Sequence, residues 1–594
     1  MIAFIAIFLT PVLMVVLWEK IFYGDNEDRR RWIVEYTLSV LMINTFDLFI
    51  VSNIFGNTGS IVAMIAEYSN FAIKYIMMSC SLAVGIPYAI QYCKKHIRVA
   101  VNVPRVNTSH SFQWRLPIIA YTLILFLLNL IRIYNNNFWG DEAFSIRLAK
   151  MSVDKMLEAT ARDVHPPLYY LLLIGAYKVF GEHGWVFHMV SIVPYAIGLI
   201  FILTVIWKKF GKGTALLMVT FTSIMSAAVT YNVEVRMYSL AMLFVLLSYY
   251  AFYLVVTREG GKITSFAFFI LASLGAAYSH YYAMMSVAFF YLALLVLVML
   301  KRLKLWQVIV TYVLTILGYL PWFPSMIASF SKVANGFWMT SIPSIQEGLL
   351  YFFDSNKIWY SWGMLGLSFF LVFIFVLLDK KVISIKKSGG KTDIQLSVPT
   401  ERMSDVSFWL LWGIIAALGT LALGELISVL IRPVFITKYL YPVVVVIWMV
   451  LSVSISRLTS LKRIMVPLVI IITFSVCMPQ YSKTYKSEKS GNEACMATVK
   501  YMNEVIKDKD VMLTDDGHLA WTVLPYYMPE VAYKEISADF SEFDANITYW
   551  LVWTKDISEE EAEWLNEYGY TVTEVYHAGN LGGSSVHLYQ MDRE

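Results

Sequence analysis

The sequence predicts a mainly α-helical membrane protein with about 14 spans and a small α/β domain in its last part. Three observations support this fold class. Of the 594 residues, 58% are hydrophobic and only 15% are charged, whereas soluble domains have about 25% charged residues. Apolar runs of about 18–22 residues, which are long enough to cross a bilayer, recur along the chain. Residues 481–594 lack such runs and carry more acidic than basic residues.

The predicted spans divide the chain into three parts. Residues 1–114 hold three N-terminal spans, residues 115–480 form a larger transmembrane module, and residues 481–594 form the α/β domain. Residues 1–18 are apolar from the first position and lack a basic n-region, so we interpret them as a span rather than as a secretory signal. The spans are expected near residues 2–19, 33–54, 71–92, 117–134, 186–207, 213–231, 236–256, 263–280, 282–300, 306–323, 360–378, 406–430, 435–456 and 463–479.

The Lys and Arg residues of the short loops indicate the orientation. Basic residues concentrate on the cytoplasmic side of membrane proteins, and with these spans the basic clusters all fall on one side. The clusters lie at residues 29–31, 94–98, 208–209, 301–304, 380–387 and 462–463. The same parity puts residues 135–185 and 481–594 on the opposite side. We therefore expect a multi-pass cell-membrane protein with an extracytoplasmic loop and an extracytoplasmic C-terminal domain.

One apolar segment, Pro167–Phe180, is left out of the span count. It has about three-quarters of a spanning length and contains Lys178. If it crossed the membrane, every later basic loop would face the wrong side. We expect a re-entrant or interfacial helix that begins at the Pro-Pro pair. Residues 135–185 then form one long outer loop that is half apolar, as a site working at the membrane surface requires.

The C-terminal part is predicted to alternate helices and strands. The expected helices are Glu493–Lys507, a short one near Leu519–Tyr527 and Ser558–Tyr568, and the expected strands are Val511–Thr514, Thr548–Trp553, Thr571–Tyr576 and Ser585–Gln590. This part has no recognisable phosphate-binding loop and no metal-spaced His/Cys set. The cysteines of the chain also lack metal-ligand spacing, and we interpret Cys80, Cys93, Cys477 and Cys495 as small buried hydrophobic residues.

Ionisable and polar residues gather at the predicted outer ends of the spans. Each of them requires an explanation, because such groups are costly close to lipid. They come from segments that are far apart in the sequence, and a site at one water-facing edge would bring them together. The candidates are Asp141, Glu142, Asp163, His165, Arg236, Tyr238, His280, Tyr281, Arg432 and Lys438.

The acidic candidates have a structural and a catalytic interpretation. Asp141 and Glu142 precede a helix expected at Ala143–Lys150, and acids are favoured at a helix N-terminus. A carboxylate in this loop is also suited to act as a general base that takes a proton from an acceptor hydroxyl. Asp163 and His165 either cap the turn before the Pro-Pro pair or belong to the same site.

The basic candidates point to an anionic ligand. Arg236 at a span end can extend to the interface like other long cationic side chains, but outer-face arginines run against the positive-inside trend. A phosphate-bearing ligand would explain Arg236, Arg432 and Lys438 together. His280, which stands among tyrosines, is either a satisfied surface histidine or a contact to that ligand.

Five motifs resemble a known superfamily. The sequences Gly140–Ser145 (GDEAFS) and Asp163–Tyr170 (DVHPPLYY) resemble the first outer loop of GT-C glycosyltransferases, and Val235–Leu240, Leu320–Pro324 and Arg432–Leu440 resemble their later motifs. The resemblance is strongest to a bacterial branch similar to family 39, the dolichyl-phosphate-mannose protein mannosyltransferases, and to the lipid A aminoarabinose transferases. It covers roughly residues 115–480.

The resemblance implies a GT-C-type helical bundle and an inverting transfer of a sugar from a polyprenyl-phosphate donor to an extracytoplasmic acceptor. Asp141 would be the general base, with Glu142, Asp163 and His165 as further catalytic residues. The expected substrate-binding residues are Arg236, Tyr238, His280, Tyr281, Arg432, Lys438 and Trp338. The chain departs from its relatives in residues 1–114, in the C-terminal domain and in Lys438, where relatives often carry Arg.

The expected partners are the polyprenyl-phosphate-linked sugar, membrane lipids and an acceptor that is a lipid, a glycan or a protein; no nucleic acid is expected. No ligand set demands a metal, although a divalent ion is compatible with the reaction. The rival interpretation is a transporter or lipid flippase, whose polar groups would lie near the membrane midplane in two matched halves. Here the polar groups lie at one edge and no repeat is visible, which favours the enzyme.

Overall fold

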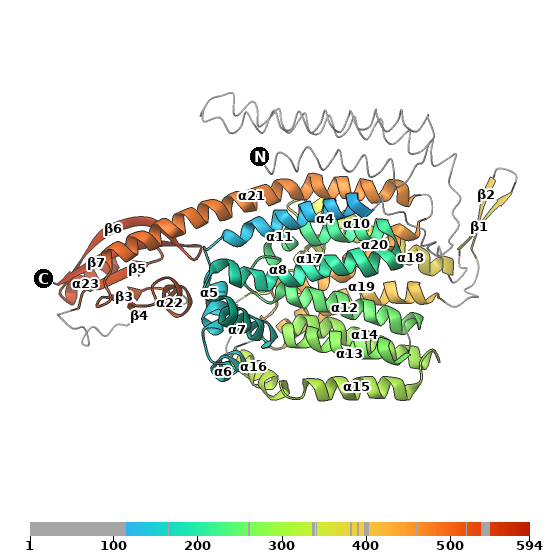
Figure 1. The fold of residues 1–594 in the computed structure, drawn as a ribbon, viewed down its shortest axis with the longest axis horizontal. Coiled ribbons are helices and arrows are strands. Elements are labelled where there is room, and N and C mark those ends of the chain that lie inside the picture. Colours follow the sequence, from blue (N-terminus) through green and yellow to red (C-terminus); the bar gives the residue numbers. More distant parts are fainter. Residues whose placement is uncertain are drawn as a thin grey trace, which may run out of the picture. The chain divides into compact units, whose positions relative to one another are not determined.

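The computed structural model describes residues 115–163, 165–258, 262–335, 339, 341–379, 383–388, 391–396, 403–458, 461–517, 519–535 and 547–593 (Figure 1). The predicted spans near 2–19, 33–54 and 71–92 lie outside these residues, and so does Trp338. The described residues form two compact units. One comprises residues 115–128, Leu199–Thr222 and Leu451–Ser475, and the other comprises Asn129–Gly198, Ser223–Val450 and Val476–Glu594.

The described part of the chain is a multi-pass membrane protein. Eight of its helices are long and apolar enough to cross a membrane, and a bent pair adds a ninth if it counts as one span. The eight are Leu116–Tyr134 (in α4, Arg115–Leu130, and η2, Ile131–Tyr134), Gly184–Phe210 (α8, Gly184–Phe201, to α9, Trp207–Phe210), Tyr238–Thr257 (α12), Tyr281–Met299 (α14), Ile358–Asp379 (α18), Asp405–Leu430 (α19), Thr437–Arg457 (η4, Thr437–Leu440, and α20, Tyr441–Arg457) and Lys462–Val505 (α21).

The predicted total of about 14 spans is not confirmed. Three of the predicted spans lie outside the described residues, and two others form helices shorter than a span. The segment at 213–231 is divided at Met225 into α10 (Lys212–Ile224) and α11 (Ser226–Tyr231), because Met225 has the extended ψ of 144°. The segment at 263–280 is α13 (Lys262–Ser279).

A sharp bend interrupts the predicted span at 306–323. Helix α15 (Leu305–Tyr319) and helix α16 (Phe323–Asn335) are bent by 70° relative to each other. Pro321 lies in the break, where its ring and its missing N–H prevent the regular helical hydrogen bonds. The bend directs α16 onto α6 (Val153–Ala161), one of the helices of the outer loop.

The loop predicted at residues 135–185 folds into three short helices. Helix α5 (Gly140–Ala149) carries Asp141 and Glu142, α6 follows it, and α7 (Leu168–Phe180) begins after the Pro-Pro pair. Helix α7 is a separate thirteen-residue helix that ends at Gly181, whose φ of +79° favours glycine. Helix α5 packs on α7, and their buried side chains form one apolar cluster with the start of α12.

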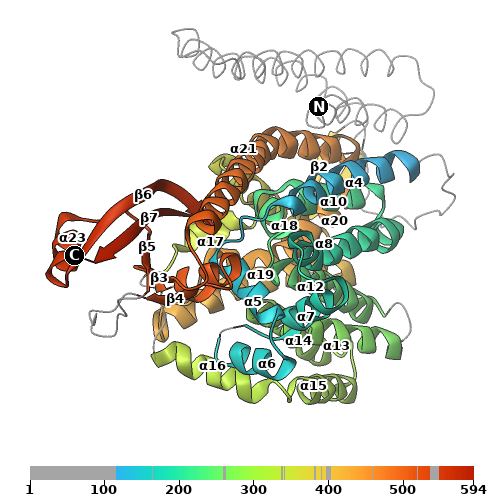
Figure 2. The same cartoon turned by 60° about the vertical axis from the view of Figure 1, so that its left-hand side comes forward.

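Within the larger unit, α12 packs against α13, α14 and α19 (Figure 2). In the smaller unit, polar side chains join the helices: Tyr121 Oη lies 2.7 Å from Thr220 Oγ1, and Thr214 Oγ1 donates to Ser456 Oγ at 2.8 Å. Helix α17 (Ile345–Tyr351) packs against α18 and α19, and a two-stranded ribbon, β1 (Ile383–Ser388) and β2 (Lys391–Leu396), follows α18.

The C-terminal part has the predicted α/β character. A five-stranded sheet has the order β4-β3-β5-β7-β6, in which β3 runs parallel to β4 and β5 while β7 is antiparallel to β5 and β6. The predicted helix at Glu493–Lys507 is the end of the 44-residue helix α21 (Lys462–Val505) rather than a separate helix. Strand β4 was not predicted from the sequence. The elements are β3 (Val511–Thr514), η5 (Leu519–Val523), α22 (Leu524–Tyr527), β4 (Ala532–Glu535), β5 (Tyr549–Trp553), α23 (Glu559–Glu567), β6 (Tyr570–Leu581) and β7 (Ser584–Arg593).

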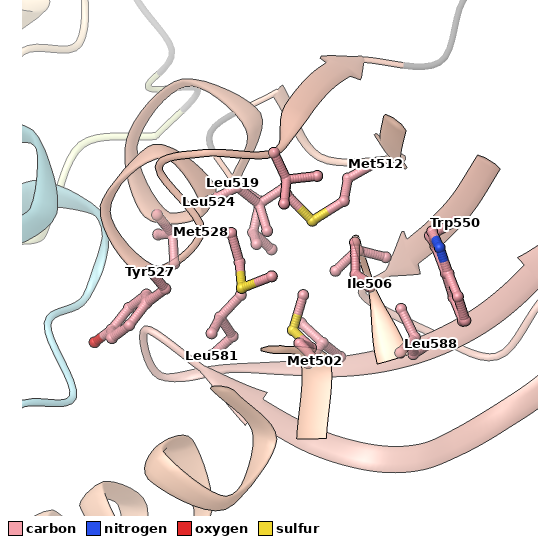
Figure 3. Close-up of a cluster of buried hydrophobic side chains, with 14 of the residues drawn as sticks. Met502, Ile506, Met512, Leu519, Leu524, Tyr527, Met528, Trp550, Leu581 and Leu588 are labelled. Carbon is pink, nitrogen blue, oxygen red and sulfur yellow. The ribbon is translucent and has the colours of Figure 1, made fainter. Parts of the chain in front are cut away.

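The core of the C-terminal domain includes a residue from the outer loop. Side chains from α21, the sheet and the short helices η5 and α22 pack together, among them Met502, Leu524 and Trp550 (Figure 3). Ala143 of α5 belongs to the same buried cluster. The helix that carries Asp141 therefore contributes directly to the apolar core of this domain.

The orientation inferred from the basic loops leads to a testable expectation. Single cysteines at the exposed positions Lys155 and Glu559, in a background without the four native cysteines, should react with a membrane-impermeant maleimide in intact cells. A cysteine at the exposed Lys304, in a basic loop, should react only after the membrane is opened. If the cysteine at position 155 or the one at position 559 does not react with the maleimide in intact cells, the proposed topology is contradicted.

Candidate functional site

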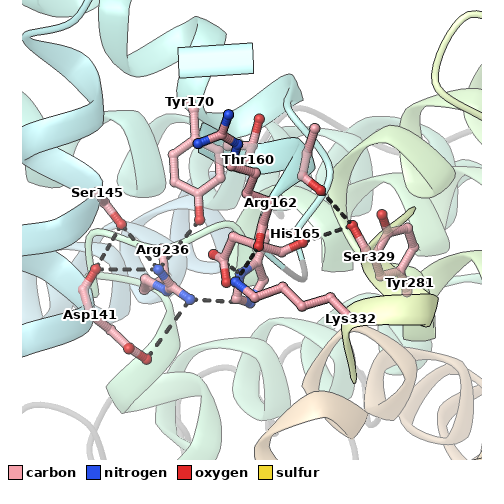
Figure 4. A network of polar contacts seen from close by, with 12 residues as sticks. Asp141, Ser145, Thr160, Arg162, His165, Tyr170, Arg236, Tyr281, Ser329 and Lys332 are labelled. Carbon is pink, nitrogen blue, oxygen red and sulfur yellow. Dashed lines mark hydrogen bonds and ion pairs between the residues drawn. The ribbon is translucent and has the colours of Figure 1, made fainter. Parts of the chain in front are cut away.

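Arg236 is the centre of a polar network between the outer loop and the start of α12 (Figure 4). Its side chain is only 3% exposed. Nη1 donates hydrogen bonds to the backbone oxygen of Asp141 at 3.2 Å, to Ser145 Oγ at 3.3 Å and to Tyr170 Oη at 3.3 Å. Nη2 donates to His165 Nε2 at 3.2 Å. One buried guanidinium thus joins α5, α7 and the turn before α7.

Two cations face the carboxylate of Asp141. Lys438 Nζ lies 3.2 Å from Asp141 Oδ2, and Arg236 Nη2 lies 3.8 Å from the same oxygen. Burial alone would raise the pKa of Asp141, but the positive charges of Arg236 and Lys438 outweigh burial and hold it below its usual value of 3.8. Asp141 is therefore a carboxylate at neutral pH, and its side chain retains 29% exposure.

Asp163 and His165 form a second pair beside Arg236. His165 Nδ1 lies 2.9 Å from Asp163 Oδ2. Because a guanidinium only donates hydrogen bonds, His165 Nε2 accepts from Arg236, and the proton of the neutral ring is on Nδ1, where it is donated to Asp163. The backbone oxygen of Asp163 accepts a hydrogen bond from Ser329 Oγ of α16 at 2.7 Å. This pair is therefore held between Arg236 and the bent helix.

Glu142 points away from Asp141 and meets another acid. Its Oε1 accepts a hydrogen bond from the backbone N–H of Val235 at 2.8 Å. Burial is the main cause that raises the pKa of Glu142 above 4.5, and the nearby Glu234 raises it further. Burial and Asp141 likewise raise the pKa of Glu234. These two buried acids hence favour protonation, whereas Asp141 is ionised.

Three buried polar atoms of the segment before α12 have no partner. Within the described part of the chain, no hydrogen bond reaches Glu234 Oε1, Arg236 Nε or Tyr238 Oη. Buried polar atoms in folded proteins almost always have a partner, so unpaired ones require a specific explanation. They lie in one five-residue stretch, next to the charged network around Asp141. A bound polar molecule would satisfy them.

Aromatic rings line the side of the site formed by α14 and η4. The ring of His280 lies 5.6 Å from Tyr238 and 5.4 Å from Tyr439 between ring centres. Its Nδ1 accepts the backbone N–H of Tyr282 at the start of α14, and burial lowers its pKa well below 6.5, so the ring is neutral. Tyr281 turns instead toward the bent helix, where its hydroxyl accepts from Trp322 Nε1 at 3.4 Å.

The structure brings together most of the residues predicted from the sequence, which we call the Asp141 site. Hydrogen bonds, ion pairs and ring contacts connect its members, whereas no such contact within the described residues links Arg432 to them, and Trp338 is not described. The members are Asp141, Glu142, Asp163, His165, Arg236, Tyr238, His280 and Lys438.

Some participants had no role assigned from the sequence. Tyr170 and Ser145 belong to the resembling motifs, but their function as acceptors for Arg236 appears only in the structure. His188, in α8, contacts the backbone oxygens of Val233 and Asn135 at 2.7 Å each and so ties the two loops of the site together. A histidine within an apolar helix is a recognisable signal, because such a residue requires polar partners.

The C-terminal domain holds the segment that precedes α5. Tyr527 Oη donates to the backbone oxygen of Asn136 at 2.6 Å and accepts from the N–H of Phe138 at 2.7 Å. Asn492 Oδ1 of α21 accepts the N–H of Asn136 at 2.7 Å. At the β6–β7 turn, a Cβ on Gly582 would lie 2.9 Å from the backbone oxygen of Phe138, so only glycine allows this close approach.

Comparisons with known proteins agree with this architecture. The family described as dolichyl-phosphate-mannose-protein mannosyltransferase matches residues 164–327. The fold is similar to that of ArnT from Cupriavidus metallidurans in the apo state, with 11% identity, a TM-score of 0.50, and coverage of 80% of this chain and 98% of that one. These similarities bear out the resemblance to GT-C glycosyltransferases that the sequence motifs indicated.

A second structure of ArnT from Cupriavidus metallidurans, bound to undecaprenyl phosphate, is 11% identical, with a TM-score of 0.46 and coverage of 81% of this chain and 98% of that one. No curated protein sequence matches the chain.

The buried acids predict a pH dependence of stability. Because the pKa of Glu142 is raised in the folded state, the folded protein binds more protons than the unfolded one above pH 4.5, and stability falls as the pH rises through this window. Glu142→Gln should reduce this fall in apparent unfolding temperature between about pH 6 and about pH 9. The expected change is several degrees, since about 1 kcal/mol corresponds to roughly 2–4 °C in domains of about 150–250 residues.

The matched control for this measurement is Glu504→Gln, which removes an exposed glutamate on α21. Its unfolding temperature should follow the wild-type pH profile. A Glu142→Gln profile as steep as that of the wild type would show that the Glu142–Glu234 pair is not the cause.

Proposed function

We propose that this protein transfers a sugar from a polyprenyl-phosphate carrier to an acceptor on the extracytoplasmic side of the membrane, with inversion at the anomeric carbon. The observation that carries the proposal is the convergence of Lys438 and Arg236 on the carboxylate of Asp141, at the ends of membrane helices. A carboxylate next to two cations combines a proton acceptor with groups that stabilise a leaving phosphate.

The two cations differ in their availability. Arg236 is buried and donates to four acceptors, so it mainly fixes the position of Asp141 and its neighbours, with Nε as its remaining donor. Lys438 has a 21% exposed side chain and pairs with Asp141. We therefore assign the principal phosphate contact to Lys438, with Arg236 in support. Among the residues that the structure describes, no contact supports the expectation that Arg432 takes part.

The proposed reaction uses these groups in a single displacement. Asp141 takes the proton of the acceptor hydroxyl while the hydroxyl oxygen forms a bond to the anomeric carbon. The bond between that carbon and the phosphate oxygen breaks on the opposite face, and the lipid phosphate leaves with the electron pair. Lys438 stabilises the negative charge that develops on the phosphate. The transferred sugar is inverted, and the proton remains on Asp141 until the product leaves.

Donor binding would also change the basicity of Asp141. In the free site, Lys438 and Arg236 lower the pKa of this carboxyl, which makes it a weak base. A phosphate next to Lys438 adds negative charge close to the carboxylate and competes for the same cation. Both effects raise the pKa of Asp141. The base would thus become stronger only when the donor is in place.

Two findings support a lipid-phosphate donor. The matching family is described by a dolichyl-phosphate-linked sugar, and its matched region, residues 164–327, contains His165, Arg236 and His280. The unpaired atoms of Glu234, Arg236 and Tyr238 offer one acceptor and two donors for the hydroxyl and phosphate groups of such a molecule.

The location of the site argues against a transporter. Asp141 follows η2, Arg236 precedes α12, His280 precedes α14, and Lys438 is in η4 before α20. The polar groups thus come from helix ends rather than from the middle of spans, where a transporter binds its substrate. This arrangement suits a reaction at the membrane surface.

The sharpest test of the proposed mechanism is Asp141→Asn. This substitution keeps the size of the side chain but removes the proton acceptor, so kcat should fall about 100- to 10,000-fold while the donor still binds. The measurement is sugar transfer by the purified protein from a polyprenyl-phosphate-sugar, with donor binding followed in parallel. Near-normal turnover would assign the base to another group, with Asp163 as the next candidate.

The role of Lys438 can be separated from that of Asp141. Lys438→Ala should raise the donor KM about ten- to a hundred-fold, because a charge-assisted hydrogen bond contributes roughly 1.5–3 kcal/mol. Lys438→Arg should retain most of the affinity, since it keeps the charge and offers two donors to a phosphate. Arg432→Ala is the matched control, because it removes a cation six positions before Lys438 that makes no contact to the Asp141 site within the described residues. Equal donor KM values for Lys438→Ala and wild type would contradict the assignment.

A further inference from the structure

Four potential ligands converge in the C-terminal domain, outside the Asp141 site. Asp556 follows β5, Glu574 and His577 are on β6, and His587 is on β7. Each side chain offers one ligand atom, and these atoms all lie within 4.8 Å of one another. The sequence did not indicate this cluster, because its members are separated by up to 31 residues (556 to 587) and follow no metal-binding spacing.

The distances within the cluster match those of a coordinated ion. Glu574 Oε1 lies 2.9 Å from His577 Nδ1 and 3.2 Å from His587 Nδ1. Asp556 Oδ1 lies 3.0 Å from His587 Nδ1 and 3.8 Å from His577 Nδ1. A zinc ion with bonds of about 2.0–2.1 Å has tetrahedral ligand atoms about 3.3 Å apart. These four separations bracket this value, so an ion would fit after small side-chain adjustments.

The strand pairing is irregular at the cluster. In a regular strand, Glu574 and His577 would point to opposite faces, because they are three positions apart. Strand β6 contains two register shifts against β7, one between Glu574 and Tyr576 and one between Tyr576 and Gly579. Bulges of this kind redirect side chains and are common at functional sites. Here they allow both side chains of β6 to meet His587.

The charges of the cluster also suit a divalent cation. Lys555, which precedes Asp556 in the sequence, is paired with another acid: its Nζ lies 3.0 Å from Glu561 Oε1. The cluster offers two carboxylates and two imidazole rings, and a doubly positive ion balances the charge of the two carboxylates.

We propose that Asp556, Glu574, His577 and His587 bind a divalent transition-metal ion, with Zn²⁺ as the best match. Imidazole and carboxylate ligands together favour zinc and its neighbours over magnesium or calcium. A set of four protein ligands is typical of a structural zinc site rather than a catalytic one. The ion would fasten the loop after β5 to the β6–β7 hairpin, whose turn contacts the segment before α5 through Gly583.

The test is zinc binding by the full-length protein, purified in detergent with an affinity tag free of histidine and stripped with EDTA. Competition with a chromophoric chelator and elemental analysis should give one zinc ion per chain. His577→Ala and Glu574→Gln should each weaken binding at least about 10-fold, since even outer-shell changes cost about 10–100-fold. His183→Ala, which removes an exposed histidine elsewhere, should bind zinc like the wild type.

A second readout separates metal binding from misfolding. The side chain of His577 is 65% exposed, so its removal leaves no cavity. Without metal, His577→Ala should therefore unfold at the same temperature as the metal-free wild type. Zinc should raise the unfolding temperature of the wild type but not of His577→Ala. Cobalt should give a tetrahedral visible spectrum with the wild type alone. The proposal is overturned if the wild type binds no stoichiometric zinc, or if His577→Ala and the wild type bind zinc equally.

Discussion

The buried charge of Arg236 is the constraint on which the rest of the site depends. A guanidinium removed from water costs several kcal/mol unless its hydrogen bonds and charge are compensated. The compensation comes from α5, from α7 and from the turn between α6 and α7, which are separate segments of one loop. Closing around Arg236 therefore gives this loop a defined conformation, and the same closure brings Asp141 within reach of Lys438.

Much of this arrangement could be predicted because membrane spans have simple sequence rules. Apolar length marked helices such as α12 and α19, and polar residues at span ends converged because span ends share one edge. Helix ends were less reliable. The span predicted at 463–479 and the helix predicted at Glu493–Lys507 belong to one helix, α21, which continues through Pro479 and Gly491. Packing explains why a glycine stands at position 491, because a Cβ there would lie 3.0 Å from Asn137 Nδ2.

The division of roles among residues depended on contacts that no periodicity reveals. The sequence indicated three cations for one phosphate but not that Arg236 is already committed to protein acceptors. It indicated Asp141 and Glu142 as a pair, whereas the structure gives them different surroundings and opposite pKa shifts. His577 and His587 meet because two bulges redirect strand β6. A bulge leaves no mark in the alternation of polar and apolar residues from which a strand is predicted.

The packing of Ala143 in the C-terminal core has a consequence for biosynthesis. The segment that supports Asp141 bonds to Tyr527, which is 389 positions later in the chain than Phe138. Contacts of such long range form late, after the intervening helices have been inserted into the membrane. A nascent chain would therefore carry the loop that holds Asp141 without this support until its last domain had folded. If the proposed function holds, this order of assembly would keep an unfinished protein from transferring sugar.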